Sequence, residues 1–119
     1  MPQKMEGRME KNIERYRAMV NVCLQDAQQP ALSMGSRANS LFDAVYMLCR
    51  IVMNGDDDGL EHPTHLVLLE AWSRMGWKME EIQPAFEHLR DWYVPELAGC
   101  QYEKLMKLAA RLNSAIESR

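Results

Sequence analysis

The most hydrophobic stretch of the chain runs from Leu41 to Met53. Asp43 and Arg50 are its only charged residues. Its apolar side chains form two interleaved rows at helical spacing: Leu41, Val45, Leu48 and Val52, and then Phe42, Tyr46, Cys49 and Met53. Together the rows cover most of the circumference of an α-helix, which is typical of a helix buried on several sides. The pattern therefore predicts a buried central helix over about residues 37–54, too short and too charged to span a membrane.

Hydrophobic residues at helical spacing predict one helix before this segment and three after it, over about residues 9–29, 63–75, 80–94 and 101–117. Pro30, Gly76 and Pro95 supply stop signals. The expected inward-facing residues are Met9, Ile13, Tyr16, Val20, Cys23 and Ala27; Leu66, Leu69, Trp72 and Met75; Ile82, Ala85, Phe86, Leu89, Trp92 and Tyr93; and Tyr102, Leu105, Ala109, Leu112 and Ile116. We expect an all-α, up-and-down bundle of four to five helices, a single domain over residues 1–119 with residues 1–8 frayed.

The start of the central helix has more than one interpretation. Ser40 and Asp43 have the spacing of a capping box, whereas Ser33 or Ser36 would cap a longer helix. Asn54-Gly55 is typical of a helix end, and the acidic residues that follow predict a solvated turn.

Composition narrows the functional classes. At 119 residues, with 47% hydrophobic and 26% charged residues, the chain fits one soluble domain with a genuine core. A net charge of −3 does not predict a surface that binds nucleic acid throughout.

The three cysteines are scattered and odd in number, which indicates reduced thiols in a cytoplasmic protein. The polar N-terminal residues lack the hydrophobic region of a signal peptide, and no membrane association is expected.

The acidic turn after the central helix has the first half of a calcium-loop pattern, Asn54-x-Asp56-x-Asp58-Gly59. The second half fails, because Glu61 takes an apolar position and His65 stands where a bidentate glutamate is needed. A polar turn between helices is the preferred interpretation.

A transition-metal site is a separate alternative. His62-x-x-His65 would place two imidazoles on one helical face, with Asp56 and Asp58 as further ligands. Neither histidine lies in a Cys-rich or His-Glu-x-x-His context, and such residues at a helix start more often cap and pack. No cofactor is therefore expected.

No part of the sequence carries a complete catalytic motif. There is no phosphate-binding loop and no Gly-x-Ser-x-Gly, and no cysteine has a neighbouring histidine. Enzymatic activity is therefore not predicted. Trp77 and Trp92 are candidate interface residues, since tryptophans frequently anchor protein contacts.

Several motifs taken together resemble HEPN domains, in particular the small members of that family that accompany minimal nucleotidyltransferases. They are Ser40 to Tyr46 (SLFDAVY) with the apolar helix after it, Asn54-Gly55, His62-x-x-His65, Phe86-x-x-Leu89-Arg90-x-x-Tyr93, Tyr102-Glu103 and Leu108-Ala109-x-x-Leu112. The likeness covers about residues 13–117. It implies a four- or five-helix bundle, dimerisation, and a role in toxin–antitoxin, phage-defence or RNA-processing systems.

The resemblance implies that ribonuclease members carry an arginine and a histidine separated by four to six residues. Arg90 occupies a plausible position for that arginine, but residues 91–97 contain no histidine. This departure puts nuclease activity in doubt.

Three functional hypotheses follow. The leading one is a non-catalytic helical binding module that acts through protein–protein contacts, as a homodimer or with a partner such as a nucleotidyltransferase. The second is a divergent HEPN ribonuclease or nucleotide-binding protein, with Arg90, Tyr93, His62 and His65 as candidate ligand or RNA contacts. The third is a metal-binding protein built on Asp56, Asp58, His62 and His65.

Overall fold

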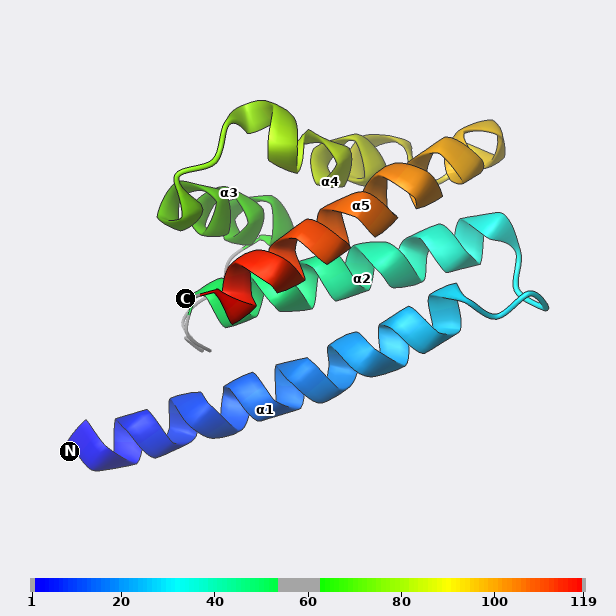
Figure 1. Cartoon of the computed structure of the whole chain (residues 1–119). Helices are drawn as coiled ribbons and strands as arrows, with labels where there is room; N and C mark the ends of the chain where they lie inside the picture. Colours follow the sequence, from blue (N-terminus) through cyan, green and yellow to red (C-terminus); the bar gives the residue numbers. More distant parts are fainter. Residues whose placement is uncertain (1, 54–62, 119) are drawn as a thin grey trace.

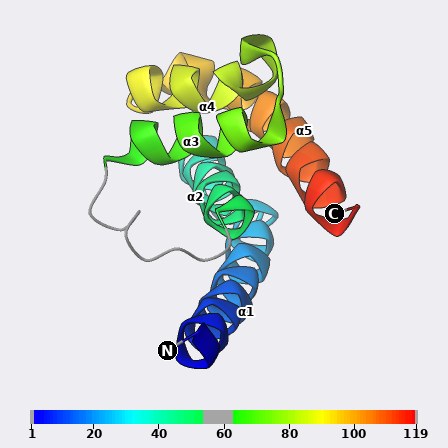
Figure 2. The ribbon, with the colours of Figure 1, turned by 90° about the vertical axis from the view of Figure 1, so that its left-hand side faces the viewer.

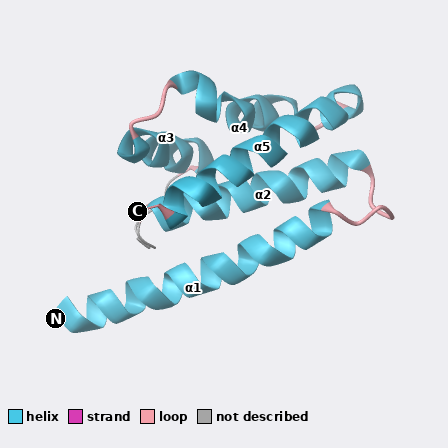
Figure 3. Cartoon of the chain, in the orientation of Figure 1, coloured by secondary structure: helices cyan, strands magenta, loops and turns pink. Residues whose placement is uncertain are grey.

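Helices make up nearly all of the chain that the structure describes (Figures 1 and 3). The structure is a computed structural model, and it describes residues 2–53 and 63–118. The helices are α1 (Pro2–Ala27), α2 (Met34–Val52), α3 (Thr64–Met75), α4 (Met79–Asp91) and α5 (Ala98–Glu117), with a short 3₁₀ helix, Pro95–Leu97, before α5. No strand occurs in these residues. The predicted all-α helical bundle is confirmed.

The central position of α2 is confirmed as well. It contacts each of the other four α-helices, and Leu41, Val45, Leu48 and Cys49 are at most 1% exposed. Helix α1 runs antiparallel to α2 along one side, and α5 lies along another (Figure 1). Helices α3 and α4 lie across α2 rather than along it (Figure 2). The bundle therefore combines a lengthwise layer with a crossing pair.

The structure decides between the alternative caps of α2. Ser33 is the N-cap, and its Oγ accepts a hydrogen bond of 3.1 Å from the backbone N–H of Ser36. Ser40 lies inside the helix. The first turn of α2, which precedes Ser40, is also held by a contact with α1. Arg37 Nε donates a 2.7 Å hydrogen bond to the backbone carbonyl of Ala27 at the end of α1. At the other end Met53 is the C-cap, and the expected stop at Asn54-Gly55 lies outside the described residues.

Two helices begin earlier than expected. Helix α1 starts at Pro2, whereas the sequence pattern predicted a start near residue 9. Proline is favourable in the first turn of a helix. Helix α5 starts at Ala98, whereas the sequence pattern predicted a start near residue 101.

The inward face expected for α3 is partly wrong. The buried residues are Val67, Leu68 and Ala71, whereas Leu66 is 43% exposed. The helix is apolar over much of its circumference, so its periodicity alone does not select one face. Its contacts with both α2 and α4 select the face that is buried. The expected stop is confirmed, since Gly76 takes a left-handed conformation with φ 68°.

Candidate functional site

An exposed pair of aromatic residues follows the end of α4. Trp92 is 58% exposed and Tyr93 is 67% exposed. Their rings pack edge to face, with centroids 6.0 Å apart and an interplanar angle of 77°. We name Trp92 and Tyr93 the aromatic corner. The prediction that both face the core is wrong, because α4 ends at Asp91 and the chain turns before either residue can join its buried stripe.

The turn that carries the aromatic corner is braced by a residue from α5. The backbone carbonyl of Asp91 accepts hydrogen bonds from the N–H of Val94, at 3.0 Å, and from Gln101 Nε2, at 3.2 Å. Gln101 is itself 6% exposed. The aromatic corner is thus held on a supported turn between two packed helices.

His88, which is not among the predicted site residues, is the third member of this arrangement. It is 3% exposed, its Nδ1 lies 2.9 Å from Gln101 Oε1, and its ring stacks on Phe42 with centroids 5.0 Å apart. Because Gln101 Nε2 donates to Asp91, Oε1 is the acceptor and His88 Nδ1 carries the hydrogen. One feature of the sequence indicates that His88 is buried: it lies three residues after Ala85, on the buried stripe of α4.

Burial keeps His88 neutral at neutral pH, so the stability of the fold depends on the protonation of this side chain. Desolvation lowers the pKa of His88 below its ordinary value of 6.5, although the Gln101 hydrogen bond and the Asp43 carboxylate both oppose the shift. Below pH 6.5 the unfolded chain therefore binds more protons at this site than the folded chain. Acidification through that window lowers the free energy of unfolding.

We expect His88→Gln to flatten this pH dependence. The wild-type urea midpoint is expected to fall more between pH 7 and pH 5 than that of the variant, whose side chain does not titrate. Asp43, which faces His88 from α2, has a raised pKa and acts in the opposite direction at lower pH in both proteins. Parallel curves for the two proteins would contradict a buried neutral His88.

A small cavity lies between α2 and α4, beside the aromatic corner. Its volume is about 190 Å³, and it is lined by Asn39, Phe42, Asp43, His88, Leu89 and Trp92. We name it the α2–α4 cavity. Trp92 belongs to both the cavity and the aromatic corner. Asp43 is exposed, yet partial desolvation raises the pKa of its carboxyl. The site therefore combines apolar walls, one exposed indole and one carboxylate.

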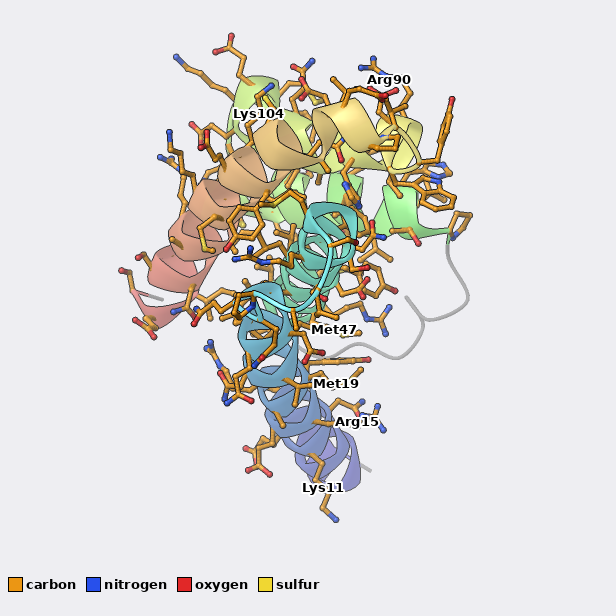
Figure 4. The ribbon with its side chains drawn as sticks, turned by 90° about the vertical axis from the view of Figure 1, so that its right-hand side faces the viewer. Lys11, Arg15, Met19, Met47, Arg90 and Lys104 are labelled. Atoms are coloured by element: carbon orange, nitrogen blue, oxygen red, sulfur yellow. The ribbon has the colours of Figure 1, made fainter. Side chains whose placement is uncertain are left out.

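Arg90 lies at a different cavity, of about 240 Å³, on the far side of α4's last turn. Its guanidinium bonds to Asp91 Oδ2, at 2.7 Å from Nη2, and Lys104 Nζ lies 3.1 Å from Glu87 Oε2. Arg90 and Lys104 project from the same end of the molecule (Figure 4). Each cation of this cavity is matched by an acidic side chain of α4, which makes it a poor site for an anion.

Within the described residues, Arg90 is the one expected RNA contact that lines this cavity. His65 is exposed in the first turn of α3 and does not line the cavity at Arg90, and His62 lies outside the described residues. Tyr93 is a neighbour of Trp92.

No family model matches this chain, and no curated protein and no solved structure is significantly similar to it. Among the described helices, none is both long enough and apolar enough to cross a bilayer.

Trp77, the other candidate interface residue, has an intramolecular partner. The guanidinium carbon of Arg111 lies 4.7 Å from the centroid of a Trp77 ring, and Arg111 also pairs with Glu81 at 2.6 Å. Trp77 is half-buried. It ties the α3–α4 turn to α5, which leaves Trp92 as the more accessible tryptophan.

The candidate metal ligands are mostly beyond what the structure describes. Asp56, Asp58 and His62 lie outside the described residues. Among the residues whose side chains the structure describes, no three His, Cys, Asp or Glu are close enough together to hold a metal ion.

Two of the three cysteine thiols offer little nucleophilic chemistry. Burial raises the pKa of Cys49 to about 12, and desolvation also raises the pKa of Cys23. Both thiols are therefore protonated at neutral pH and unreactive as nucleophiles. Cys100 is exposed on the first turn of α5.

Proposed function

We propose that this protein is a non-catalytic helical binding module that contacts another protein through the aromatic corner, Trp92 and Tyr93. The observation that carries the proposal is their exposure, 58% and 67%, on a turn braced by Gln101. Tryptophan and tyrosine dominate the energetic centres of protein interfaces. Their rigid placement lowers the entropy that binding must overcome.

The chemistry of the titratable groups supports binding rather than catalysis. His88 is buried and hydrogen-bonded to Gln101, Cys49 is buried, and Arg90 is bonded to Asp91. Nucleotide or RNA binding through Arg90 and Tyr93, the alternative function, has weaker support because the guanidinium already has a carboxylate partner. A metal-binding function would depend on residues outside the described part of the chain.

The resemblance to HEPN domains suggests what the partner is. It favours a second copy of this chain or a nucleotidyltransferase, in a toxin–antitoxin or phage-defence setting. The free thiols of Cys23, Cys49 and Cys100 support a reducing compartment, which we propose is the cytoplasm.

The test is affinity purification of the tagged full chain from its native host, with quantitative mass spectrometry of the co-purified proteins. We expect the double variant Trp92→Ala/Tyr93→Ala to recover at least about tenfold less of the dominant partner, since an aromatic truncation at an interface centre costs about 1.4 kcal/mol or more. Light scattering of the purified chain, run in parallel, shows whether that partner is a second copy.

The matched control is Leu66→Ala/Met79→Ala, which removes two other exposed apolar side chains, 43% and 45% exposed, from α3 and α4. Circular dichroism checks that both double variants remain folded. Equal recovery of the same partner on wild type and on Trp92→Ala/Tyr93→Ala would overturn the proposal.

A further inference from the structure

We propose that the α2–α4 cavity receives a lysine or arginine side chain of the partner protein, held between the Asp43 carboxylate and the Trp92 indole. The inference rests on the proposed function and specifies the chemistry that the aromatic corner recognises. It follows from the charge, the walls and the size of the cavity.

The charge of the cavity is negative and has no fixed counter-charge in its lining. None of the six lining residues is a lysine or an arginine. The group facing Asp43 from α4 is His88, which burial keeps neutral, and the groups near it on α1 are the Cys23 thiol and, beside that thiol, the Asp26 carboxylate. Partial desolvation raises the pKa of Asp43, so a guest cation would offset an existing electrostatic cost.

The walls suit the rest of a long cationic side chain. Phe42 and Leu89 supply apolar surface for its methylene groups, which lysine and arginine commonly lay along such surfaces. Trp92, 58% exposed, lines the cavity, and a cation over the face of an indole gains about 0.5–1 kcal/mol at an exposed site. Asn39 adds a neutral polar group.

The size of the cavity points to one side chain rather than to a small-molecule ligand. Its volume of about 190 Å³ is below the range of about 300–1,000 Å³ that is usual for small-molecule sites. A phosphate group is disfavoured by the Asp43 carboxylate. A basic side chain of a protein partner therefore matches the cavity better than a nucleotide or RNA.

The test uses the full chain and two matched probes, N-acetyl-arginine methylamide and its neutral isostere N-acetyl-citrulline methylamide. Each is titrated to tens of millimolar while NMR follows the Trp92 indole N–H and the His88 ring. We expect saturable shifts with the arginine probe and at least threefold weaker binding of the citrulline probe. Asp43→Asn is expected to remove this difference. Equal responses to both probes, or none to either, would overturn the inference.

Glu103→Gln, which neutralises an exposed acid on α5, is the matched control and is expected to bind the arginine probe as wild type does. Asp43→Asn is expected to fold with unchanged or higher stability at neutral pH. The native environment already disfavours the charged form of Asp43, as its raised pKa shows.

The same variants separate this inference from the proposed function. Partner recovery that falls at least threefold with Asp43→Asn and at least tenfold with Trp92→Ala/Tyr93→Ala supports both. Recovery that falls only with the aromatic double variant leaves the binding module standing and overturns the cation pocket. Recovery unchanged in both overturns the two together.

Discussion

Leu48→Ala is expected to lower the free energy of unfolding by about 2–5 kcal/mol, because truncation of a buried leucine loses its transfer free energy and leaves a hole. Leu48 is 1% exposed and belongs to the core cluster that joins α2 to α1 and α5. Urea denaturation with linear extrapolation measures the change.

Leu66→Ala is the matched control, since it makes the same chemical change at a leucine that is 43% exposed. We expect it to cost less than about 1 kcal/mol, because little surface leaves water at that position. A loss below about 1 kcal/mol for Leu48→Ala would contradict the central position of α2.

Tyr16→Phe is expected to destabilise the fold by about 1.5–3 kcal/mol, the range for a hydrogen bond to a charged group. Arg50 is fully buried, at 0% exposed, and its Nη2 donates a 2.9 Å hydrogen bond to the Tyr16 hydroxyl. The guanidinium carbon also lies 5.4 Å from the Tyr16 ring centroid. Phenylalanine keeps the ring but removes one acceptor from a buried cation. Chemical denaturation at neutral pH measures the loss.

Tyr102→Phe is the control for that experiment. The Tyr102 hydroxyl lies 3.4 Å from Arg37 Nη2, in a half-buried setting, and the guanidinium again lies over the ring at 4.9 Å. Arg37 keeps its 2.7 Å bond to the Ala27 carbonyl in the variant. We expect a loss below about 1 kcal/mol. Equal losses at the two tyrosines would show that the burial of Arg50 does not set the cost.

Arg50 illustrates a limit of the sequence pattern. In the sequence it interrupts the central apolar run as one of two charges, and nothing local distinguishes it from Asp43. The structure places Arg50 at 0% exposure against Tyr16 of α1, whereas Asp43 remains exposed beside the α2–α4 cavity. The difference comes from a partner 34 residues earlier in the chain, which periodicity does not encode.

The aromatic corner shows the same limit at a helix end. Trp92 and Tyr93 continue the apolar stripe of α4, so the pattern predicts that they face inward. In the structure α4 ends at Asp91, whose carbonyl binds Gln101 from ten residues further along. Two residues expected in the core are thereby placed in solvent, and His88 takes a buried position.

The amino-acid sequence by itself determined the all-α class, the order of the helices, the burial of α2 and the stop at Gly76. These follow from helical periodicity and local backbone preferences, which act over a few neighbouring residues. Only the tertiary structure decided which residue caps the N-terminus of α2 and that the Arg50 side chain is buried. It alone also set the buried face of α3, the exposure of Trp92 and the cavity beside Asp43. Those features depend on contacts between residues distant in the chain, where packing and burial override a local preference.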